Sequence, residues 1–333
     1  MIPTNTPQIS KTWVDNFDKH VAIILTTVLY MIINFESIAQ TANNTENRLP
    51  IIDMHMHTGL PHHVPEGMPA ICRPAPCEGE GQATVNATEL MKKTMQEMDK
   101  YNIVKGFLSG VDYSSVQAWK KEAPDKFLAS PFILDVANTN FEELKQAYEA
   151  GKFSGMGEIG AQLMGVGPND ALLEPYFELA AKHDLPVLIH TLGIGPYMPH
   201  FSTSNGSPKL LEEVLKRHPK LRIFAENAGY PFRDEMIAMM YQYPQLYVDV
   251  STITWVIPQL AFYDYLEALV RAGLGKRIMF GSDQMVWPEK IGEAVKAIEN
   301  APFLSNEQKR DIFYNNAARF LRLNGDEYNS LKH

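Results

Sequence analysis

Apolar and polar residues follow two alternating patterns along the chain from residue 51 onward. Short apolar runs rich in β-branched residues are typical of buried strands, and apolar residues spaced three or four positions apart are typical of helices with one buried face. The first pattern predicts strands at 51–54, 103–108, 129–134, 153–158, 186–190, 221–225, 246–250 and 277–280. The second predicts helices at 86–100, 115–123, 141–150, 171–183, 208–217, 232–241, 258–272, 290–300 and 306–323.

Each predicted strand is followed by a predicted helix, and this order defines the fold class. Strands that alternate with helices lie parallel and are joined by right-handed crossovers. Eight such units in about 250 residues fit a closed (β/α)8 barrel. The sequence therefore predicts an α/β protein, a single (β/α)8 TIM barrel over residues 41–333. It has a long loop after the first strand, at 58–85, and an extra C-terminal helix, at 306–323, that we expect to pack outside the barrel.

The N-terminal segment differs in its pattern from the barrel region. An uncharged, mostly apolar run at 21–34 follows Lys11 and Lys19 and precedes the small-x-small sequence Ser37-Ile-Ala39. This arrangement is typical of a removable signal peptide, and the run is shorter than the roughly 20 residues that span a bilayer. We expect residues 1–40 to be removed and the protein to be exported to the periplasm or secreted, with no membrane association afterwards. The alternative is an uncleaved N-terminal anchor.

The composition limits the classes of partner. Hydrophobic residues make up 45% of the chain and the formal net charge is −9, with acidic and basic residues interspersed. Such a chain can bury a large core and lacks the basic patch that binds nucleic acid or an anionic membrane. We expect a small-molecule substrate and no nucleic acid, and the sequence leaves a homo-oligomer open. Cys72 and Cys77 form a disulfide or stay free thiols, because no further soft metal ligands lie near them.

Ionisable residues stand at the ends of several predicted strands. His55 and His57 follow the first strand, Glu158 ends the fourth, His190 ends the fifth, and Asp283 follows the eighth. Each alone has an ordinary explanation, such as a helix cap for Asp283 or a core position for His190. In a (β/α)8 barrel, however, the C-terminal ends of all strands meet at one face, where the active site lies. Three histidines and one or two carboxylates at that face suit a divalent ion with an open position for water.

The same residues carry a resemblance to a known family. The His-x-His pair, His190 and the Gly-Ser-Asp283 sequence resemble the amidohydrolase superfamily, and within it the amidohydrolase-related group of metal-dependent hydrolases, lactonases and decarboxylases. The resemblance extends over about residues 50–323. It implies that His55, His57, His190 and Asp283 bind the metal, and that Asp283 is the general base on a metal-activated water.

The resemblance also bears on the number and identity of the metal ions. The sequence Gly157-Glu158-Ile-Gly160 resembles the strand-four motif of the TatD-type branch, where the glutamate helps to hold two metals. Glu158 is thus a candidate metal ligand, although a site with one ion is favoured over a site with two. Zinc is the first expectation, with manganese and iron as alternatives, because all three suit three histidines and an aspartate.

One position departs from the family pattern. The family usually has a histidine on the sixth strand in a His-x-Gly context, and Asn227 stands there in this chain. An asparagine can donate a hydrogen bond but cannot take up a proton near neutral pH. We therefore expect Asn227 to act as a donor to the oxyanion. The neighbouring Glu226 is expected to face away from the barrel if the strand stays regular.

The sequence therefore predicts a metal-dependent hydrolase that cleaves an amide, lactone or ester bond of a small, carboxylated substrate. Asp283 and Asn227 are the expected catalytic residues. The loops after the first and sixth strands supply the expected substrate-binding residues, which are Arg73, His62, His63, Tyr230 and Arg233. Two alternatives stay open: a metal-dependent carboxy-lyase of the same superfamily, and a non-catalytic binding protein on the same barrel. Release of carbon dioxide would distinguish the carboxy-lyase from a hydrolase.

Overall fold

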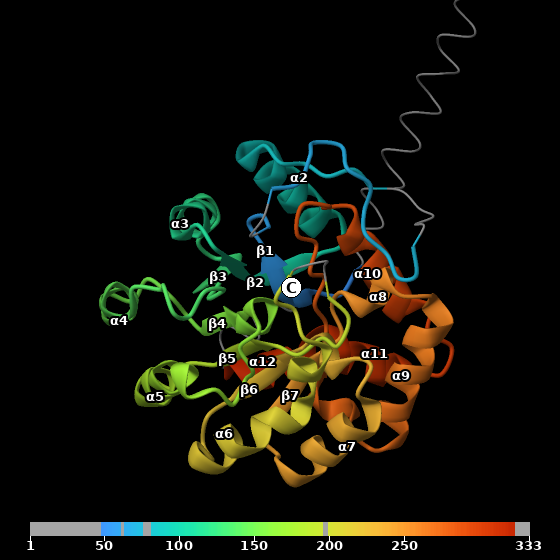
Figure 1. Ribbon diagram of the computed structural model, residues 1–333. Helices are drawn as coiled ribbons and strands as arrows, with labels where there is room; N and C mark the ends of the chain where they lie inside the picture. The colour runs from blue at the N-terminus through green and yellow to red at the C-terminus, as the bar shows by residue number, and fades with distance from the viewer. Residues whose placement is uncertain (1–47, 61–62, 76–80, 196–198, 324–333) are drawn as a thin grey trace, which may run out of the picture. The chain divides into compact units, whose positions relative to one another are not determined.

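The computed structural model describes residues 48–60, 63–75, 81–195 and 199–323 (Figure 1). The chain separates after Arg48 into an N-terminal segment and the unit Leu49–His333, which contains every element named below. The predicted signal peptide at 1–40 lies outside the described residues, so its removal and the export of the protein stay predictions. No helix within the described ranges is long and apolar enough to cross a bilayer.

Eight strands within the described residues form the wall of a barrel. In chain order they are β1 (Ile51–His57), β2 (Ile103–Gly110), β3 (Phe127–Pro131), β4 (Met156–Ile159), β5 (Val187–His190), β6 (Ile223–Glu226), β7 (Leu246–Asp249) and β8 (Ile278–Met279). Each strand pairs in parallel with the next in sequence, in one group from β1 to β3 and another from β4 to β8. The predicted parallel order is therefore confirmed.

Two seams join these groups into a ring. Between β3 and β4, Ile133 forms a parallel bridge with Ile159, and Ile133 N donates to Glu158 O (2.7 Å). Between β8 and β1, Asp283 N donates to His55 O (2.8 Å). The (β/α)8 barrel predicted from the sequence is thus confirmed. Both seams involve the main chain of predicted site residues, so closing the barrel also positions the site.

Helices cover the outside of the barrel (Figure 1). They are α2 (Ala87–Lys100), α3 (Tyr113–Glu122), α4 (Phe141–Glu149), α5 (Glu174–Lys182), α6 (Glu212–Arg217), α7 (Arg233–Gln242), α9 (Gln259–Arg271) and α10 (Lys290–Glu299), with the short α8 (Ile253–Val256) after β7. Helix α2 shows how the sequence specifies them. Leu90, Thr94 and Met98 recur every four residues and form its buried stripe. Asn86 Oδ1 accepts a hydrogen bond from Glu89 N (3.0 Å) and caps the helix.

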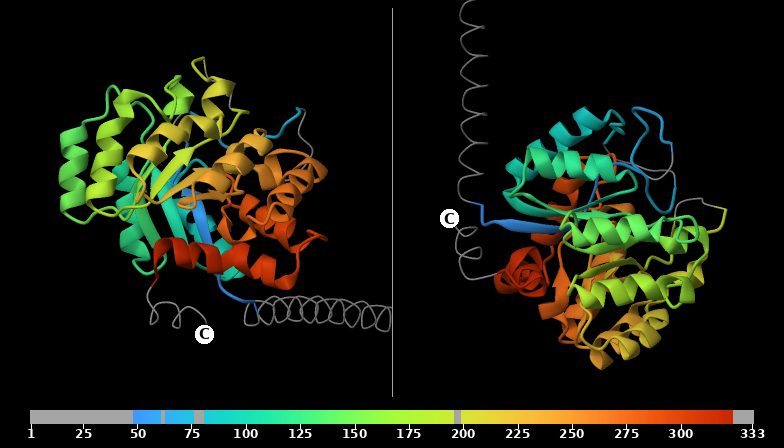
Figure 2. Two further views of the ribbon diagram at one scale, coloured as in Figure 1. Left: turned by 90° about the horizontal axis from the view of Figure 1, so that it is seen from below. Right: turned by 90° about the vertical axis from the view of Figure 1, so that its left-hand side faces the viewer.

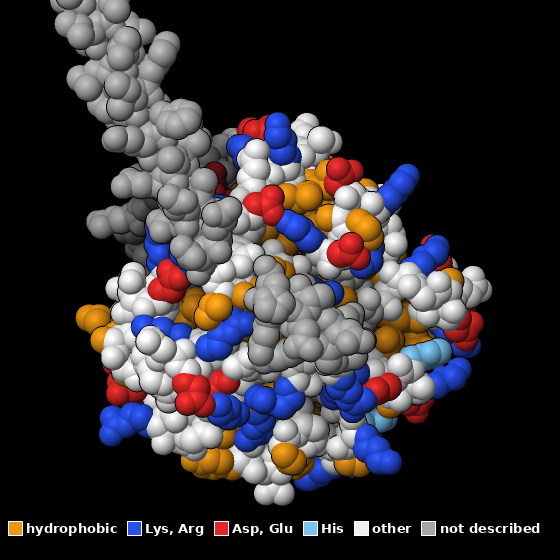
Figure 3. Space-filling model, turned by 180° about the vertical axis from the view of Figure 1, so that it is seen from behind, with side chains coloured by type: hydrophobic (Ala, Val, Ile, Leu, Met, Phe, Trp, Pro, Cys, Tyr) orange, Lys and Arg blue, Asp and Glu red, His pale blue; other side chains and the backbone are white. Residues whose placement is uncertain are grey.

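Charged side chains of both signs cover the outer surface. On the face seen in Figure 3, Lys and Arg side chains are interspersed with Asp and Glu side chains and with apolar ones. Some form ion pairs one helical turn apart, such as Lys93 with Glu89 (2.9 Å) and Lys100 with Glu97 (2.9 Å). Exposed pairs of this kind contribute little to stability, so the fold depends on its buried cores.

Apolar side chains fill the barrel interior at the N-terminal ends of the strands. They are Ile52, Met54, Phe107, Leu188, Phe224 and Met279. The C-terminal helix consists of α11 (Asn306–Arg310), the π-helical turn η7 (Asp311–Asn315) and α12 (Asn316–Leu321). It lies across this end of the barrel (Figure 2) and adds Tyr314 and Phe320 to the same cluster. The predicted helix is present, but it closes the barrel end instead of joining the outer layer, because its aromatic side chains are buried against the interior.

Strand β1 is irregular where the predicted site begins. Its pairing with β2 shifts register between Asp53 and Met56, and Asp53 Oδ1 accepts a hydrogen bond from His55 N (3.1 Å). Met54 belongs to the interior cluster, whereas Met56 belongs to the larger core between barrel and helices. The irregularity therefore lets β1 place Met54 and the neighbouring His55 both inside the barrel.

Replacing Phe320 by alanine should destabilise the protein by about 3–5 kcal/mol, the usual loss for a buried phenylalanine. Phe320 is 2% exposed, and its ring centroid lies 5.4 Å from that of Phe224 and 4.9 Å from that of Tyr247. Urea-induced unfolding measures the change. Leu260→Ala is the control, because Leu260 is 76% exposed and its loss should change stability by no more than about 0.5 kcal/mol. Equal effects of the two substitutions would contradict a closing role for the C-terminal helix.

Candidate metal centre

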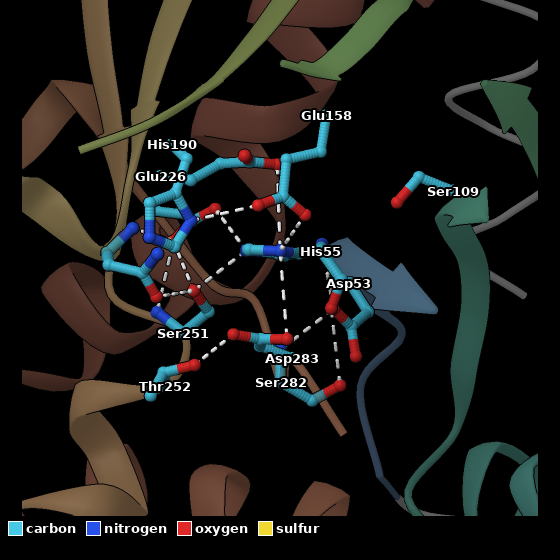
Figure 4. Close-up of polar contacts among 12 residues, drawn as sticks. Asp53, His55, Ser109, Glu158, His190, Glu226, Ser251, Thr252, Ser282 and Asp283 are labelled. Carbon is cyan, nitrogen blue, oxygen red and sulfur yellow. Dashed lines mark hydrogen bonds and ion pairs between the residues drawn. The ribbon is translucent and has the colours of Figure 1, made fainter. Parts of the chain in front are cut away.

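The two histidines of β1 bring their Nε2 atoms together at the C-terminal end of the barrel. Figure 4 shows His55 with Glu158 and Asp283 on either side of it. His55 Nε2 and His57 Nε2 are 3.1 Å apart, and the two residues are only 2% and 5% exposed. Ser251 Oγ lies 2.9 Å from His55 Nδ1, and Ser109 Oγ on β2 lies 3.0 Å from His57 Nδ1. Each ring is thus oriented through its Nδ1 so that its Nε2 is available to a metal ion.

Glu158, at the end of β4, contacts all three predicted histidine ligands. Its Oε1 lies 2.9 Å from His190 Nδ1. Its Oε2 lies 3.2 Å from His57 Nε2 and 3.4 Å from His55 Nε2. His190 Nε2 is buried and has no hydrogen-bond partner among the described residues. The structure thus brings His190, from the end of β5, to the β1 histidines through Glu158.

Asp283 joins the group from the loop after β8. Its Oδ1 lies 3.1 Å from His57 Nε2 and 3.8 Å from His55 Nε2. Thr252 Oγ1 donates a hydrogen bond to its other oxygen, Oδ2. Oδ1 is buried and accepts no hydrogen bond from the described part of the chain, so this oxygen is free for a ligand.

The donor atoms fit a divalent cation. Metal bonds to imidazole nitrogen and carboxylate oxygen of about 2.0–2.2 Å place neighbouring donor atoms roughly 3.0–3.5 Å apart. The separations among His55 Nε2, His57 Nε2 and Glu158 Oε2 are 3.1, 3.2 and 3.4 Å. The unpartnered Asp283 Oδ1 adds a further donor at 3.1 Å from His57 Nε2. This spacing and the buried, unsatisfied oxygen both match a metal site.

Mutual contact sets the charges of these groups. Burial lowers the pKa of His57, but the neighbouring carboxylates of Asp283 and Glu158 raise it to about 9. Burial raises the pKa of Glu158, but its contacts with His190, His55 and His57 hold it well below its usual range. The pKa of Asp283 is lowered as well, because the charge of His55 and contact with His57 outweigh burial. A divalent ion at this place would displace the protons of the imidazoles and would balance the negative charges of the carboxylates in their place.

Asn227 lies behind His55 and not at the face of the site. Its Oδ1 lies 3.0 Å from Ser251 Oγ, the atom that also contacts His55 Nδ1. Its main-chain N donates to Asp249 Oδ1 (2.9 Å). Asn227 is fully buried and does not line the pocket described below. The predicted role as an oxyanion donor does not fit this position, whereas a role in holding Ser251 and His55 does.

Glu226 faces into the barrel, in contrast to the prediction. It pairs with His190 in the parallel ladder, and paired residues on neighbouring strands point to the same face. Its Oε1 lies 3.7 Å from His55 Nε2. Burial raises the pKa of Glu226 well above its usual range, against the effect of His55. The prediction failed because β6 ends at Glu226, and Asn227 starts the turn η5 (Asn227–Gly229) with a φ of 61°.

The sequence analysis missed two residues that the structure places beside His55. Asp249, at the end of β7, has its Oδ2 3.3 Å from His55 Nδ1, and Ser251 follows it. Asp249 continues the series of polar residues at strand ends, and this position was the signal that could have revealed it. The register of β6 against His190 would likewise have indicated the inward direction of Glu226.

A pocket opens onto the group from the loops at the C-terminal ends of the strands. Its polar lining consists of His57, Glu158, His190, Thr252 and Asp283, together with Arg73. Its apolar walls are Leu60, Ile71, Phe132, Leu163, Leu192, Ile194, Val256 and Met285. The space between the walls, including the part open to solvent, is about 670 Å³.

Arg73 is the predicted substrate-binding residue that the structure brings to this pocket. Its Nη2 donates to Gly195 O (3.1 Å) and its Nη1 donates to Cys72 O (2.8 Å). Main-chain carbonyls therefore hold the guanidinium group at the pocket wall. Cys72 is disulfide-bonded, and Cys77 lies outside the described residues.

The other predicted substrate-binding residues are not at the pocket. Tyr230 and Arg233 line a separate depression, because the Tyr230 ring packs against Tyr265 of α9 with 5.2 Å between centroids. Arg233 pairs with Asp234 (2.9 Å). His63 is exposed and does not line the pocket. His62 lies outside the described residues.

Solved structures share this architecture. An uncharacterized TIM-barrel protein from Bordetella bronchiseptica is 19% identical with a TM-score of 0.59, over 82% of this chain and 99% of that one. A probable 2-pyrone-4,6-dicarboxylic acid hydrolase from Acinetobacter baumannii, with citric acid bound, is 14% identical with a TM-score of 0.54, over 83% and 100%. A dihydroxybenzoic acid decarboxylase from Polaromonas sp. JS666, with bound manganese and the inhibitor 2-nitroresorcinol, is 14% identical with a TM-score of 0.53, over 84% and 99%.

Similarity at these identities shows the fold, and a family match in the sequence shows more. No curated protein matches the chain. The sequence profile of a family described as amidohydrolase matches residues 52–323, well over half of the chain. This range contains the residues of the candidate metal centre, and the resemblance seen in the sequence is confirmed. The chain belongs to the amidohydrolase family.

Proposed function

We propose that the protein is a metal-dependent hydrolase that cleaves an amide, lactone or ester bond of a small, largely apolar substrate carrying a carboxylate. The observation that carries the proposal is the state of Asp283. Its Oδ1 is buried, accepts no hydrogen bond from the described residues, and lies 3.1 Å from His57 Nε2 at the polar end of an apolar pocket. An ionised carboxylate beside a cation site is the group that activates a water molecule.

The ligands of the ion would be His55 Nε2, His57 Nε2 and Glu158 Oε2, with Asp283 Oδ1 next to them. His190 orients Glu158 through Nδ1, and its Nε2 is buried without a hydrogen-bond partner among the described residues. When bound, a divalent ion polarises the substrate carbonyl and lowers the pKa of a water molecule towards about 7. Zinc, manganese and iron all suit this mixture of nitrogen and oxygen ligands, so elemental analysis of the purified protein must identify the metal.

Asp283 would move the proton during hydrolysis. Thr252 Oγ1 donates to Oδ2, and this hydrogen bond holds the carboxylate in one orientation. Oδ1 is then the atom that accepts a proton from the attacking water. The same oxygen returns the proton to the leaving oxygen or nitrogen as the carbonyl bond breaks, so that one water is consumed for each bond cleaved.

The pocket indicates the kind of substrate. Most of its lining is apolar, and Arg73 places a cation on its wall. A guanidinium group can bind a carboxylate through two parallel hydrogen bonds. We therefore infer a substrate with an apolar body, a carbonyl group at the metal and a carboxylate at Arg73.

Protein reconstituted with zinc or manganese should hydrolyse such substrates, and Asp283→Asn should lower kcat by roughly 10²–10⁴-fold, because an amide cannot accept the proton of water. Initial rates on carboxylated lactones, esters and amides measure the effect, and metal analysis shows whether the variant still holds its ion. Asp264→Asn is the matched control, because Asp264 is exposed on α9 and does not line the pocket.

Mass spectrometry of the products distinguishes the two reactions known among the structural neighbours. Hydrolysis adds one water to the substrate, whereas a carboxy-lyase removes carbon dioxide. Release of carbon dioxide, or an unchanged kcat in Asp283→Asn, would contradict the proposed hydrolysis.

Arg73→Gln should raise KM for a carboxylated substrate by roughly 10–100-fold, the effect of losing a charge-assisted pair of about 1.5–3 kcal/mol. The value of kcat should change little, because the hydrogen bonds that the structure describes for Arg73 go to the main-chain oxygens of Cys72 and Gly195 and not to the metal-binding residues. KM for a neutral analogue should be unaffected in the variant. Arg271→Gln, at an exposed position on α9, is the control. An equal rise in KM for the neutral and the carboxylated substrate would show that Arg73 only shapes the loop.

Metal affinity should increase with pH up to about pH 9. In the metal-free protein the pKa of His57 is raised to about 9, so binding below that pH must displace its proton, and each such proton weakens the affinity by about tenfold per pH unit. Isothermal titration calorimetry at pH 7 in buffers of different ionisation enthalpy should detect at least one proton released per ion. Equal affinities at pH 6.5 and pH 8.5 would contradict the displacement of a proton from His57 when the ion binds.

A further inference from the structure

A buried tryptophan contacts the peptide bond that precedes Asp283. Trp255 belongs to the short helix α8 and is 9% exposed, and its Nε1 donates a hydrogen bond to Ser282 O (2.8 Å). Trp255 does not line the pocket, so it does not contact a substrate bound there. Its polar atom is directed instead at the main chain of the loop after β8.

The peptide bond between Ser282 and Asp283 is held at both of its polar atoms. Ser282 O accepts the bond from Trp255, and Asp283 N donates to His55 O (2.8 Å). Because a peptide group is planar, two hydrogen bonds on opposite sides of it fix its rotation. Trp255 and the contact with β1 thereby set the direction in which the backbone of Asp283 continues.

The backbone of Asp283 needs this support. Its φ of 48° lies in the left-handed region, which residues other than glycine adopt uncommonly. Ser282 is fully buried, and a buried carbonyl that loses its donor is strongly unfavourable. Without the indole N–H, the peptide group would therefore rotate towards another donor, and the carboxylate of Asp283 would move with the backbone.

The same helical turn also holds the side chain of Asp283. Thr252, three residues before Trp255, donates from Oγ1 to Asp283 Oδ2 (Figure 4). Trp255 N donates to Thr252 O (3.2 Å), and residues three positions apart on a helical turn share a face. One turn therefore binds both the carboxylate and the preceding peptide bond, and Oδ1 is left as the oxygen that accepts no hydrogen bond from the described residues.

The Trp255 ring is fixed by its own neighbours. It packs edge-on against the ring of Trp287, with 6.3 Å between centroids. Lys290 Nζ lies over the ring, 5.7 Å from its centroid, and a cation over an indole face is attracted to it. These contacts on the ring give its N–H a defined direction.

We propose that Trp255 is a positioning residue for Asp283. Its indole N–H holds the peptide bond before Asp283, so that Oδ1 stays 3.1 Å from His57 Nε2. The inference rests on the proposed function, in which this oxygen accepts the proton of the attacking water. Loss of the N–H should therefore reduce turnover and leave substrate binding nearly unchanged.

Trp255→Phe removes the N–H and keeps an aromatic ring, and Trp287→Phe is its matched control. Trp287 Nε1 also donates to a main-chain oxygen, Met68 O (2.9 Å), but this oxygen belongs to the loop after β1. We expect kcat on a carboxylated ester, lactone or amide to fall by roughly 10–100-fold in Trp255→Phe, because small displacements of a reacting group are costly. KM should change little. Trp287→Phe should keep the kcat of the wild type.

A double-mutant cycle shows whether Trp255 acts through Asp283. In protein that already carries Asp283→Asn, Trp255→Phe should lower kcat by no more than about twofold, because the effects of residues that act as a unit do not add. A crystal structure of Trp255→Phe should show Asp283 Oδ1 displaced from His57 Nε2. Metal content and thermal unfolding identify a misfolded variant. In that case Trp255→Met, whose flexible side chain fills irregular space and has no N–H, takes its place.

Three results would overturn the positioning role and leave the proposed function standing. They are an unchanged kcat in Trp255→Phe, an equal loss of kcat in Trp287→Phe, and the same fold-loss with and without Asp283→Asn. If the wild type hydrolyses none of these substrates, or if Asp283→Asn keeps its kcat, the proposed function itself fails and the positioning role fails with it.

Discussion

The seam between β8 and β1 is the contact on which both the barrel and the site depend. Strand β8 is only two residues long, so a regular ladder closes little of the barrel there. Side chains supply the missing bonds: Asp53 Oδ1 accepts from His55 N (3.1 Å) and Ser282 N (2.9 Å). The Gln284 side chain accepts from His57 N (3.2 Å) and donates to His57 O (2.6 Å). The bonds that close the barrel therefore also fix the two histidines relative to the loop that carries the proposed general base.

The barrel interior is divided along its axis into an apolar half and a polar half. At the N-terminal ends of the strands the interior is apolar and is closed by Tyr314 and Phe320 of the C-terminal helix. At the C-terminal ends it is polar, and its histidines and carboxylates contact one another. Because the apolar half is closely packed, the strands do not shift in response to attraction and repulsion among the charged side chains of the polar half. The distances among the ligand atoms are therefore properties of the fold, and a metal ion meets a site that is already arranged.

The features that depend on hydrophobic periodicity and on the residues at strand ends could be predicted from the sequence. It predicted the eight strand–helix units, the inward direction of His55 and His57, and the gathering of Glu158, His190 and Asp283 at one barrel end, all of which the structure shows. It could not predict where a strand stops. Strand β6 ends at Glu226, so Glu226 points inward and Asn227, the next residue, lies behind His55. Loop residues such as Tyr230 were unpredictable for another reason, because their direction depends on packing against distant helices.

Strand β6 contributes side chains to both the apolar half and the polar half of the barrel interior. Phe224 and Glu226 lie on the same inner face, two residues apart, so the carboxylate stands directly next to the apolar cluster. Glu226 is fully buried, and neither of its carboxylate oxygens accepts a hydrogen bond from the described residues. Burial therefore raises the pKa of Glu226 well above its usual range, and His55, 3.7 Å away, opposes this shift. The better the apolar half is packed, the less an ionised carboxylate above it is tolerated, so the packing of the apolar half influences the protonation of Glu226.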